Sequence, residues 1–216
     1  MRWQALRVAD VLALAQEERG ELASFLEELT PAQWDAPTLC SRWSVRDVVA
    51  HVIGYDVQGM TGFWRTFVLA GGSPDRANQR VVDAFRELEP FGLLDLVRRY
   101  RTPEGPTARF GYRIALTDGA IHQQDMRRPL GMPRTIPPER LRAILDFAMV
   151  APPIRASVRT RGLRLVATDL DWSSGQGPEV RGPGEAVLMV AAGRRDALGE
   201  VDGAGLDTLT ERMPRD

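Results

Sequence analysis

Apolar residues at helical spacing fill the first two thirds of this sequence. They recur at intervals of three and four residues, and proline or glycine ends most of the runs, which is typical of amphipathic helices separated by turns. The predicted helices cover residues 6–29, 44–71, 78–101 and 108–128. Ser44 and Asp47 fit a helix-capping box at the start of the second helix, and Pro90 favours a division of the third. This series predicts an up-and-down four-helix bundle.

The last part of the sequence has a different character. After Pro152 and Pro153 the helical pattern stops, and glycine and proline become dense from 175 to 184. The shorter elements expected on both sides of this break are a helix at 139–150, a strand at 163–167 and helices at 185–192 and 205–212. We therefore expect a mainly α protein with two domains, a bundle at residues 1–155 and a small α+β domain at residues 156–216.

Charge and cysteine content narrow the classes of function. The formal net charge is −1, so no general attraction to nucleic acid or to an anionic membrane is expected. The single cysteine, Cys40, excludes an intrachain disulfide and fits a reducing compartment. The N-terminal residues lack the apolar core of a signal peptide, and no segment has the run of about 20 apolar residues that spans a bilayer. We expect a cytoplasmic protein.

The basic residues exclude further kinds of chemistry. All 28 of them are arginine, so the chain can form no Schiff base through lysine and has no phosphate-binding lysine of the Walker type. No GxGxxG sequence follows a strand-like run. Chemistry that depends on a bound nucleotide is therefore not expected.

The two histidines of the chain are the clearest candidates for a functional site. His51 lies in SVRDVVAHVIGYD and His122 lies in ALTDGAIHQQD, both of which are predicted helices. Asp118 precedes His122 by four residues, so their side chains share one helix face about one turn apart. With His51 supplied by another helix, the three side chains predict a metal site that leaves one coordination position open.

Three longer stretches resemble a known family. In order and spacing they are similar to the mycothiol-dependent maleylpyruvate isomerase family of the DinB-like superfamily. The stretches are WDAPTLCSRWSVRDVVAHV, ALTDGAIHQQDMRRPLG and RLVATDLDWSSGQGPEVRGPGEAVLMVAAGRRD. The resemblance implies a DinB-like four-helix bundle with a C-terminal α/β domain. It also implies a divalent metal, usually zinc, and the low-molecular-weight thiol mycothiol as cofactor.

The resemblance assigns roles to individual residues. His51 and His122 match the two histidine ligands, and Asp118 stands where the family has glutamate or histidine. Asp125 is an alternative ligand or a hydrogen-bond acceptor for an imidazole. Arg194 matches an arginine of the C-terminal domain that belongs to the family's active site.

The expected activity follows from an open metal position. A thiol bound to zinc loses its proton and becomes a nucleophile, so we expect a transferase or isomerase that acts on a small electrophilic organic substrate. The alternatives are a metal-dependent hydrolase at the same site and a non-catalytic ligand-binding or regulatory protein. Cys40 is interpreted as a structural thiol, and Tyr55 as a candidate hydroxyl donor near the metal.

Overall fold

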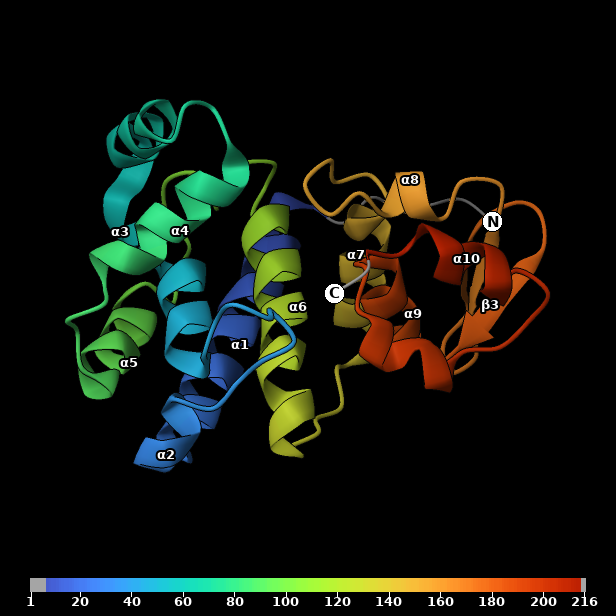
Figure 1. The fold of residues 1–216 in the computed structure, drawn as a ribbon, viewed down its shortest axis with the longest axis horizontal. Helices are drawn as coiled ribbons and strands as arrows, with labels where there is room; N and C mark the ends of the chain where they lie inside the picture. Colours follow the sequence, from blue (N-terminus) through green and yellow to red (C-terminus); the bar gives the residue numbers. More distant parts are fainter. Residues whose placement is uncertain (1–6, 215–216) are drawn as a thin grey trace. The chain divides into compact units, whose positions relative to one another are not determined.

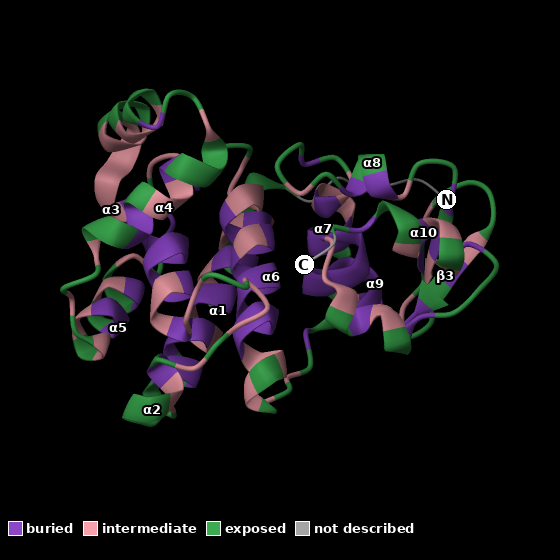
Figure 2. Cartoon of the chain, viewed as in Figure 1, coloured by how far each residue is buried: buried purple, intermediate pink, exposed green. Residues whose placement is uncertain are grey.

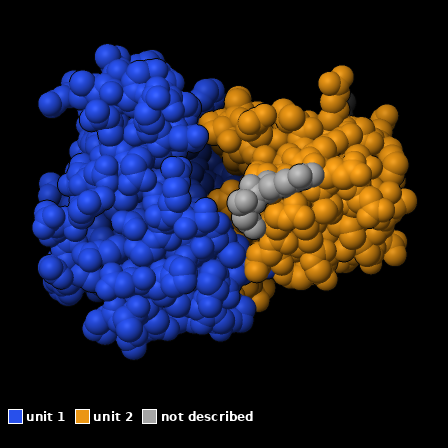
Figure 3. Space-filling model, in the orientation of Figure 1, with its two compact units in different colours: residues 1–133 blue, residues 134–216 orange. Residues whose placement is uncertain are grey.

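The computed structural model of the protein describes residues 7–214 and divides into two units after Pro133. Figure 3 shows the two units in different colours, and each is described here by itself. None of the helices in this part of the chain combines the length and the apolar character of a bilayer-spanning segment. The mainly α fold with a small C-terminal sheet is confirmed.

Four helices form the bundle of the first unit: α1 (Val8–Glu27), α3 (Val45–Leu69), α5 (Pro90–Arg99) and α6 (Arg113–Leu130). Both α1 and α3 contact α5 and α6, so the bundle closes in the order α1, α6, α3, α5. Consecutive long helices α1 and α3 therefore face each other across the core, rather than lying next to each other as a simple sequential bundle would have them. The 13 residues from Tyr100 to Tyr112, between α5 and α6, are long enough to cross one end of the bundle.

Two further helices lie in the connections of this unit. The first is α2 (Pro31–Trp34), and the second is α4 (Pro74–Ala84), which packs along α3. Gly54 of α3 permits this close packing, because a Cβ atom there would collide with Val81 of α4. The predicted third helix is thus two helices, α4 and α5, and α5 begins at Pro90 as the sequence suggested.

The bundle core is built from the apolar stripes of its helices, which are buried in Figure 2. α3 supplies more of this core than any other helix, through a run that begins at Val45 and ends at Ile53. The buried residues of the cluster are Leu22, Ala23, Phe25, Leu26, Trp34, Val45, Val48, Val49, Ala50, Val52, Ile53, Leu93, Leu94, Val97 and Met126. Burial of each large apolar side chain contributes roughly 1.5–3 kcal/mol, so the valine-rich half of α3 is held firmly in place.

Helix α3 is interrupted at Gly59. This residue has φ 62° and ψ −169°, a non-helical conformation inside the helix that favours glycine because no Cβ is present. The sequence predicted one continuous helix here. The half of α3 before Gly59 is the half that carries His51 and packs in the core.

A buried ion pair joins three parts of the first unit. Arg19 of α1 donates to Asp56 of α3 over 2.8 Å, and the two side chains are 2% and 0% exposed. The second carboxylate oxygen of Asp56 accepts hydrogen bonds from the backbone N–H of Glu104, at 2.7 Å, and from the hydroxyl of Thr107, at 2.5 Å. Asp56 thereby fixes the loop that leads into α6 against α1 and α3.

The second unit begins with α7 (Pro138–Ala148), which packs against α9 (Gly184–Ala191). We had expected the helix at 139–150 to belong to the bundle and the boundary to lie after residue 155. The structure divides the chain earlier, after Pro133, because the apolar face of α7 is covered by an element of the C-terminal part.

A three-stranded sheet forms the other layer of this unit. Its strands are β1 (Arg164–Ala167), β2 (Trp172–Gly175) and β3 (Glu179–Gly182), in the order β2–β1–β3. β1 is antiparallel to β2 and parallel to β3, and α9 packs against β1 and β3. The sequence predicted only β1, because the other two strands, WSSG and EVRG, contain few apolar residues and lie among glycines and prolines. The remaining elements are α8 (Ala156–Arg159), the 3₁₀ helix η1 (Arg195–Glu200) and α10 (Leu206–Arg212).

We expect Asp56→Ala to lower the free energy of unfolding by about 3–5 kcal/mol, because the substitution leaves the guanidinium of Arg19 buried without a counter-charge. Urea denaturation followed by circular dichroism measures the loss. Asp83→Ala is the control, since Asp83 pairs with Arg86 at the exposed surface and its removal should change the midpoint little. A loss for Asp56→Ala no larger than that of the control would contradict this assignment.

Candidate metal centre

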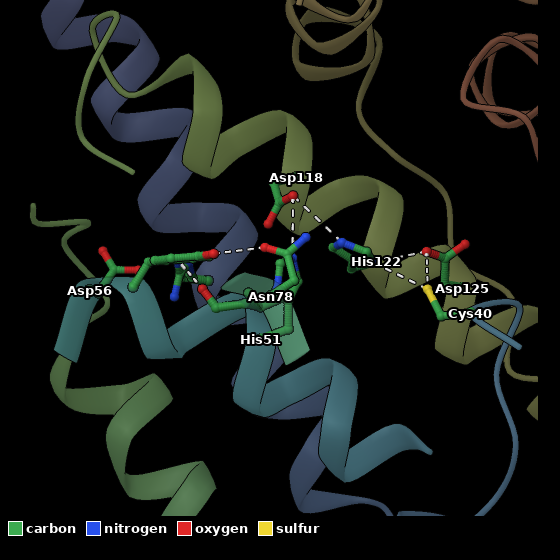
Figure 4. Close-up of polar contacts among 10 residues, drawn as sticks. Cys40, His51, Asp56, Asn78, Asp118, His122 and Asp125 are labelled. Carbon is green, nitrogen blue, oxygen red and sulfur yellow. Dashed lines mark hydrogen bonds and ion pairs between the residues drawn. The ribbon is translucent and has the colours of Figure 1, made fainter. Parts of the chain in front are cut away.

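The three side chains predicted as metal ligands meet in the first unit. Asp118 Oδ1 lies 3.5 Å from His122 Nε2 and 3.9 Å from His51 Nε2. His51 comes from α3, and the other two residues come from adjacent turns of α6. We call these three residues the donor cluster, and Figure 4 shows them turned toward one another. They converge because α3 and α6 are neighbours in the bundle.

The spacing of the donor cluster fits one small cation. The three candidate ligand atoms all lie within 4.8 Å of one another. Two ligand atoms placed about 2.1 Å from a tetrahedral ion are roughly 3.4 Å apart, so small side-chain rotations would bring all three to one ion. Two imidazole nitrogens and one carboxylate oxygen suit zinc and several other divalent metals.

Asp125 sets the orientation of the His122 ring. Its Oδ2 atom lies 2.9 Å from His122 Nδ1, and the Asp125 side chain is fully buried. A carboxylate at this distance accepts the hydrogen of Nδ1, which leaves the lone pair of Nε2 directed toward Asp118 and His51. Metal-binding histidines are usually held in this way by a carboxylate or a carbonyl group. This is the second of the two roles that the sequence suggested for Asp125.

The His51 ring is held by packing instead. Its Nδ1 atom is buried and has no hydrogen-bond partner among the residues that the structure describes. The Trp43 ring packs on it with centroids 4.9 Å apart, and the Tyr55 ring meets it edge-on at 6.0 Å. His122 contacts it from a third direction, at 4.9 Å. Aromatic neighbours therefore hold the His51 ring in its orientation, whereas a carboxylate holds the His122 ring.

Two amides of α4 complete the surroundings of His51. Trp43 Nε1 donates to Gln79 Oε1 over 3.1 Å, and the Tyr55 hydroxyl donates to Asn78 Oδ1 over 2.7 Å. The Trp43 and Tyr55 rings, which pack on His51, are thus hydrogen-bonded to α4. The sequence reasoning missed Asn78 and Gln79, because their contacts are made between helices and no spacing within the chain marks them.

The charged groups of the site shift one another's pKa values. Burial lowers the pKa of His51. Burial would also lower the pKa of His122, but the charges of Asp118 and Asp125 hold it well above its ordinary value. Burial would raise the pKa of Asp118, yet His122 and His51 keep it below its usual range. The two carboxylates therefore favour a positive charge at this position, whether it is a proton on His122 or a cation.

Cys40 lies on the other side of His122. Its Sγ donates to Asp125 Oδ2 over 3.3 Å and is 3.8 Å from His122 Nδ1. Cys40, His122 and Asp125 therefore form a second group that satisfies the distance requirements of a metal site. Because both groups use His122, a single variant of Cys40 or His51 can tell them apart.

Arg194 belongs to the second unit. It precedes η1, and its guanidinium donates to the carbonyl oxygen of Ala192 over 3.0 Å. Burial, together with the charges of Arg194 and Arg155, lowers the pKa of Arg159 to about 10. Arg194 thus has another arginine, Arg159, near it in its own unit. Trp172 and Asp169, also in this unit, have structural contacts: Trp172 donates to Asp146, and Asp169 accepts from the backbone of Gly184.

Comparison with family models gives a match for the first unit. Residues 15–102 match the family model of the mycothiol maleylpyruvate isomerase N-terminal domain. The expected resemblance to this family is confirmed. The matched segment includes His51 but ends before Asp118 and His122.

Two solved structures share the fold. Both are crystal structures of mycothiol-dependent maleylpyruvate isomerase, one of them a histidine-to-alanine mutant. The mutant has a TM-score of 0.59 at 17% identity, and the other structure has a TM-score of 0.55 at 16% identity. Each match covers 92% of this chain and 93% of the other. At such identities the likeness is one of fold. The chain has no match among curated proteins.

Proposed function

We propose that this protein is a metal-dependent enzyme that uses mycothiol to isomerise or S-conjugate a small electrophilic substrate. The observation that carries the proposal is the convergence of His51, Asp118 and His122, with Asp125 orienting one of the imidazoles. The match of residues 15–102 to the isomerase family supports the choice of thiol. An enzyme that depends on a reduced thiol belongs in the cytoplasm.

The donor cluster would hold a divalent ion, with zinc the metal that its nitrogen and oxygen ligands suit well. Such an ion lowers the pKa of a bound thiol, so that the sulfur reacts as a thiolate. Asp125 keeps His122 in the ligand tautomer, and Trp43 with Tyr55 keeps the His51 ring in place and shields it from water. Aspartate is one methylene shorter than glutamate, so Asp118 must lie close to the ion.

We expect the purified protein to contain about one equivalent of divalent metal, as a three-ligand site does, and His51→Ala to lose it. Elemental analysis by mass spectrometry measures the content. Cys40→Ser is the matched control and should keep the metal, because Cys40 lies outside the donor cluster. The reverse result, with metal lost in Cys40→Ser and kept in His51→Ala, would place the ion in the group of Cys40, His122 and Asp125.

The activity itself is tested with mycothiol and a simple electrophile such as N-ethylmaleimide. We expect the metal-loaded protein to accelerate thioether formation, followed by mass spectrometry, and the chelated protein to lose the acceleration. Hydrolysis of an ester substrate without thiol consumption would favour the hydrolase that the same open metal position allows. Metal content without either reaction would favour a binding protein.

Arg194 is proposed as a residue that contributes to activity, on the basis of the family resemblance. We expect Arg194→Ala to lower kcat/KM for an anionic electrophile roughly tenfold, the effect of losing one charged hydrogen bond. Arg195→Ala is the control, because Arg195 donates to the carbonyl oxygen of Thr210 and should affect activity little. If Arg195→Ala has the larger effect, the residue assignment is shifted by one position.

A further inference from the structure

The start of α4 carries two adjacent amides that differ in one respect. Gln79 uses both ends of its side chain: Oε1 accepts from Trp43, and Nε2 donates to Asp83 Oδ1 over 3.0 Å. Asn78 uses only one end, because Oδ1 accepts from Tyr55, and Nδ2 has no partner among residues 7–214. One hydrogen-bond donor is therefore left available beside the donor cluster.

The contact with Tyr55 determines which end of the Asn78 amide is available. The Tyr55 hydroxyl donates its hydrogen to Oδ1 over 2.7 Å, which leaves the NH₂ group of Asn78 on the other side. In Figure 4 the amide end of Asn78 points toward the side of the site where Asp118 lies.

The position of Asn78 follows from contacts around His51. Tyr55 connects Asn78 to the His51 ring, and Trp43 connects the next residue of α4 to the same ring. The first turns of α4 thus lie over the imidazole that the donor cluster takes from α3. A neutral N–H donor fixed beside a cation site is suited to an oxygen atom that gains negative charge during a reaction.

We propose that Asn78 Nδ2 donates a hydrogen bond to the carbonyl oxygen of a conjugated electrophile, and that Tyr55 is the positioning residue that holds the amide. The inference rests on the proposed function and adds a catalytic residue to it. As the thiolate sulfur bonds to the β-carbon, the π electron pair moves toward the carbonyl oxygen, where Asn78 stabilises it. Reprotonation of the α-carbon by water gives a conjugate, and loss of the thiolate after bond rotation gives an isomer.

The test compares two electrophiles in the metal-loaded protein with mycothiol. N-ethylmaleimide has a conjugated carbonyl oxygen, whereas benzyl chloride reacts by displacement and has none. We expect Asn78→Ala to slow kcat with the maleimide about 100-fold more than kcat with benzyl chloride, the usual effect of removing one such donor. Asn78→Asp, which keeps an acceptor for Tyr55 but lacks the N–H donor, should show the same selective loss.

Two further variants separate positioning from general damage. Tyr55→Phe should show a selective loss of about tenfold with the maleimide, in kcat rather than in KM, because the amide is then free to rotate. Gln79→Ala should leave the ratio between the two electrophiles unchanged, since both ends of that amide are already used. Metal content and the unfolding midpoint of every variant show whether the site is still assembled.

The outcomes are distinct. Equal losses with both electrophiles, or a raised KM for mycothiol alone, would overturn the assignment of Asn78 to the carbonyl oxygen while the proposed function stands. An unchanged ratio in both Asn78 variants would overturn it as well. If the wild-type protein conjugates neither electrophile, the proposed function fails and the inference fails with it.

Discussion

The hydrogen-bonded carboxylate of Asp56 determines much of the geometry of the first unit. It lies on the same half of α3 as His51, and it holds Arg19 of α1 and the loop around Glu104 and Thr107. That loop leads directly into α6, which carries Asp118 and His122. One buried side chain thus ties α3 to the loop before α6, and these are the two helices that supply the donor cluster.

Much of the site could be predicted because its pattern is local. Asp118 and His122 are four residues apart on one helix, so any helix would place them on one face, and His51 was the only other histidine. The contacts between helices could not be predicted from the sequence. Asn78 lies 27 positions after His51 and meets it only through Tyr55, so no periodicity connects the two.

The fold class was predicted correctly, but the neighbours of each helix were not predicted, for the same reason. The amphipathic runs predicted the long helices of the bundle, but they carry no information on which helices become neighbours. The order of the bundle and the grouping of α7 with α9 depend on tertiary packing. β2 and β3 were missed because their sequences, WSSG and EVRG, contain few apolar residues and lie among glycines and prolines, whereas β1 lies in the apolar run LRLVA.

The interruption of α3 at Gly59 divides one long helix into two pieces, of which the first carries His51 and packs in the core. A helix passes a shift or rotation along its axis only where its backbone hydrogen bonds are continuous. The piece after the break exposes Trp64 and Val68, which are 57% and 72% accessible. A sequence change in this outer piece therefore reaches the imidazole through side-chain contacts and not through the helix backbone: the Phe63 ring meets the Tyr55 ring at 5.8 Å, and Tyr55 in turn contacts His51.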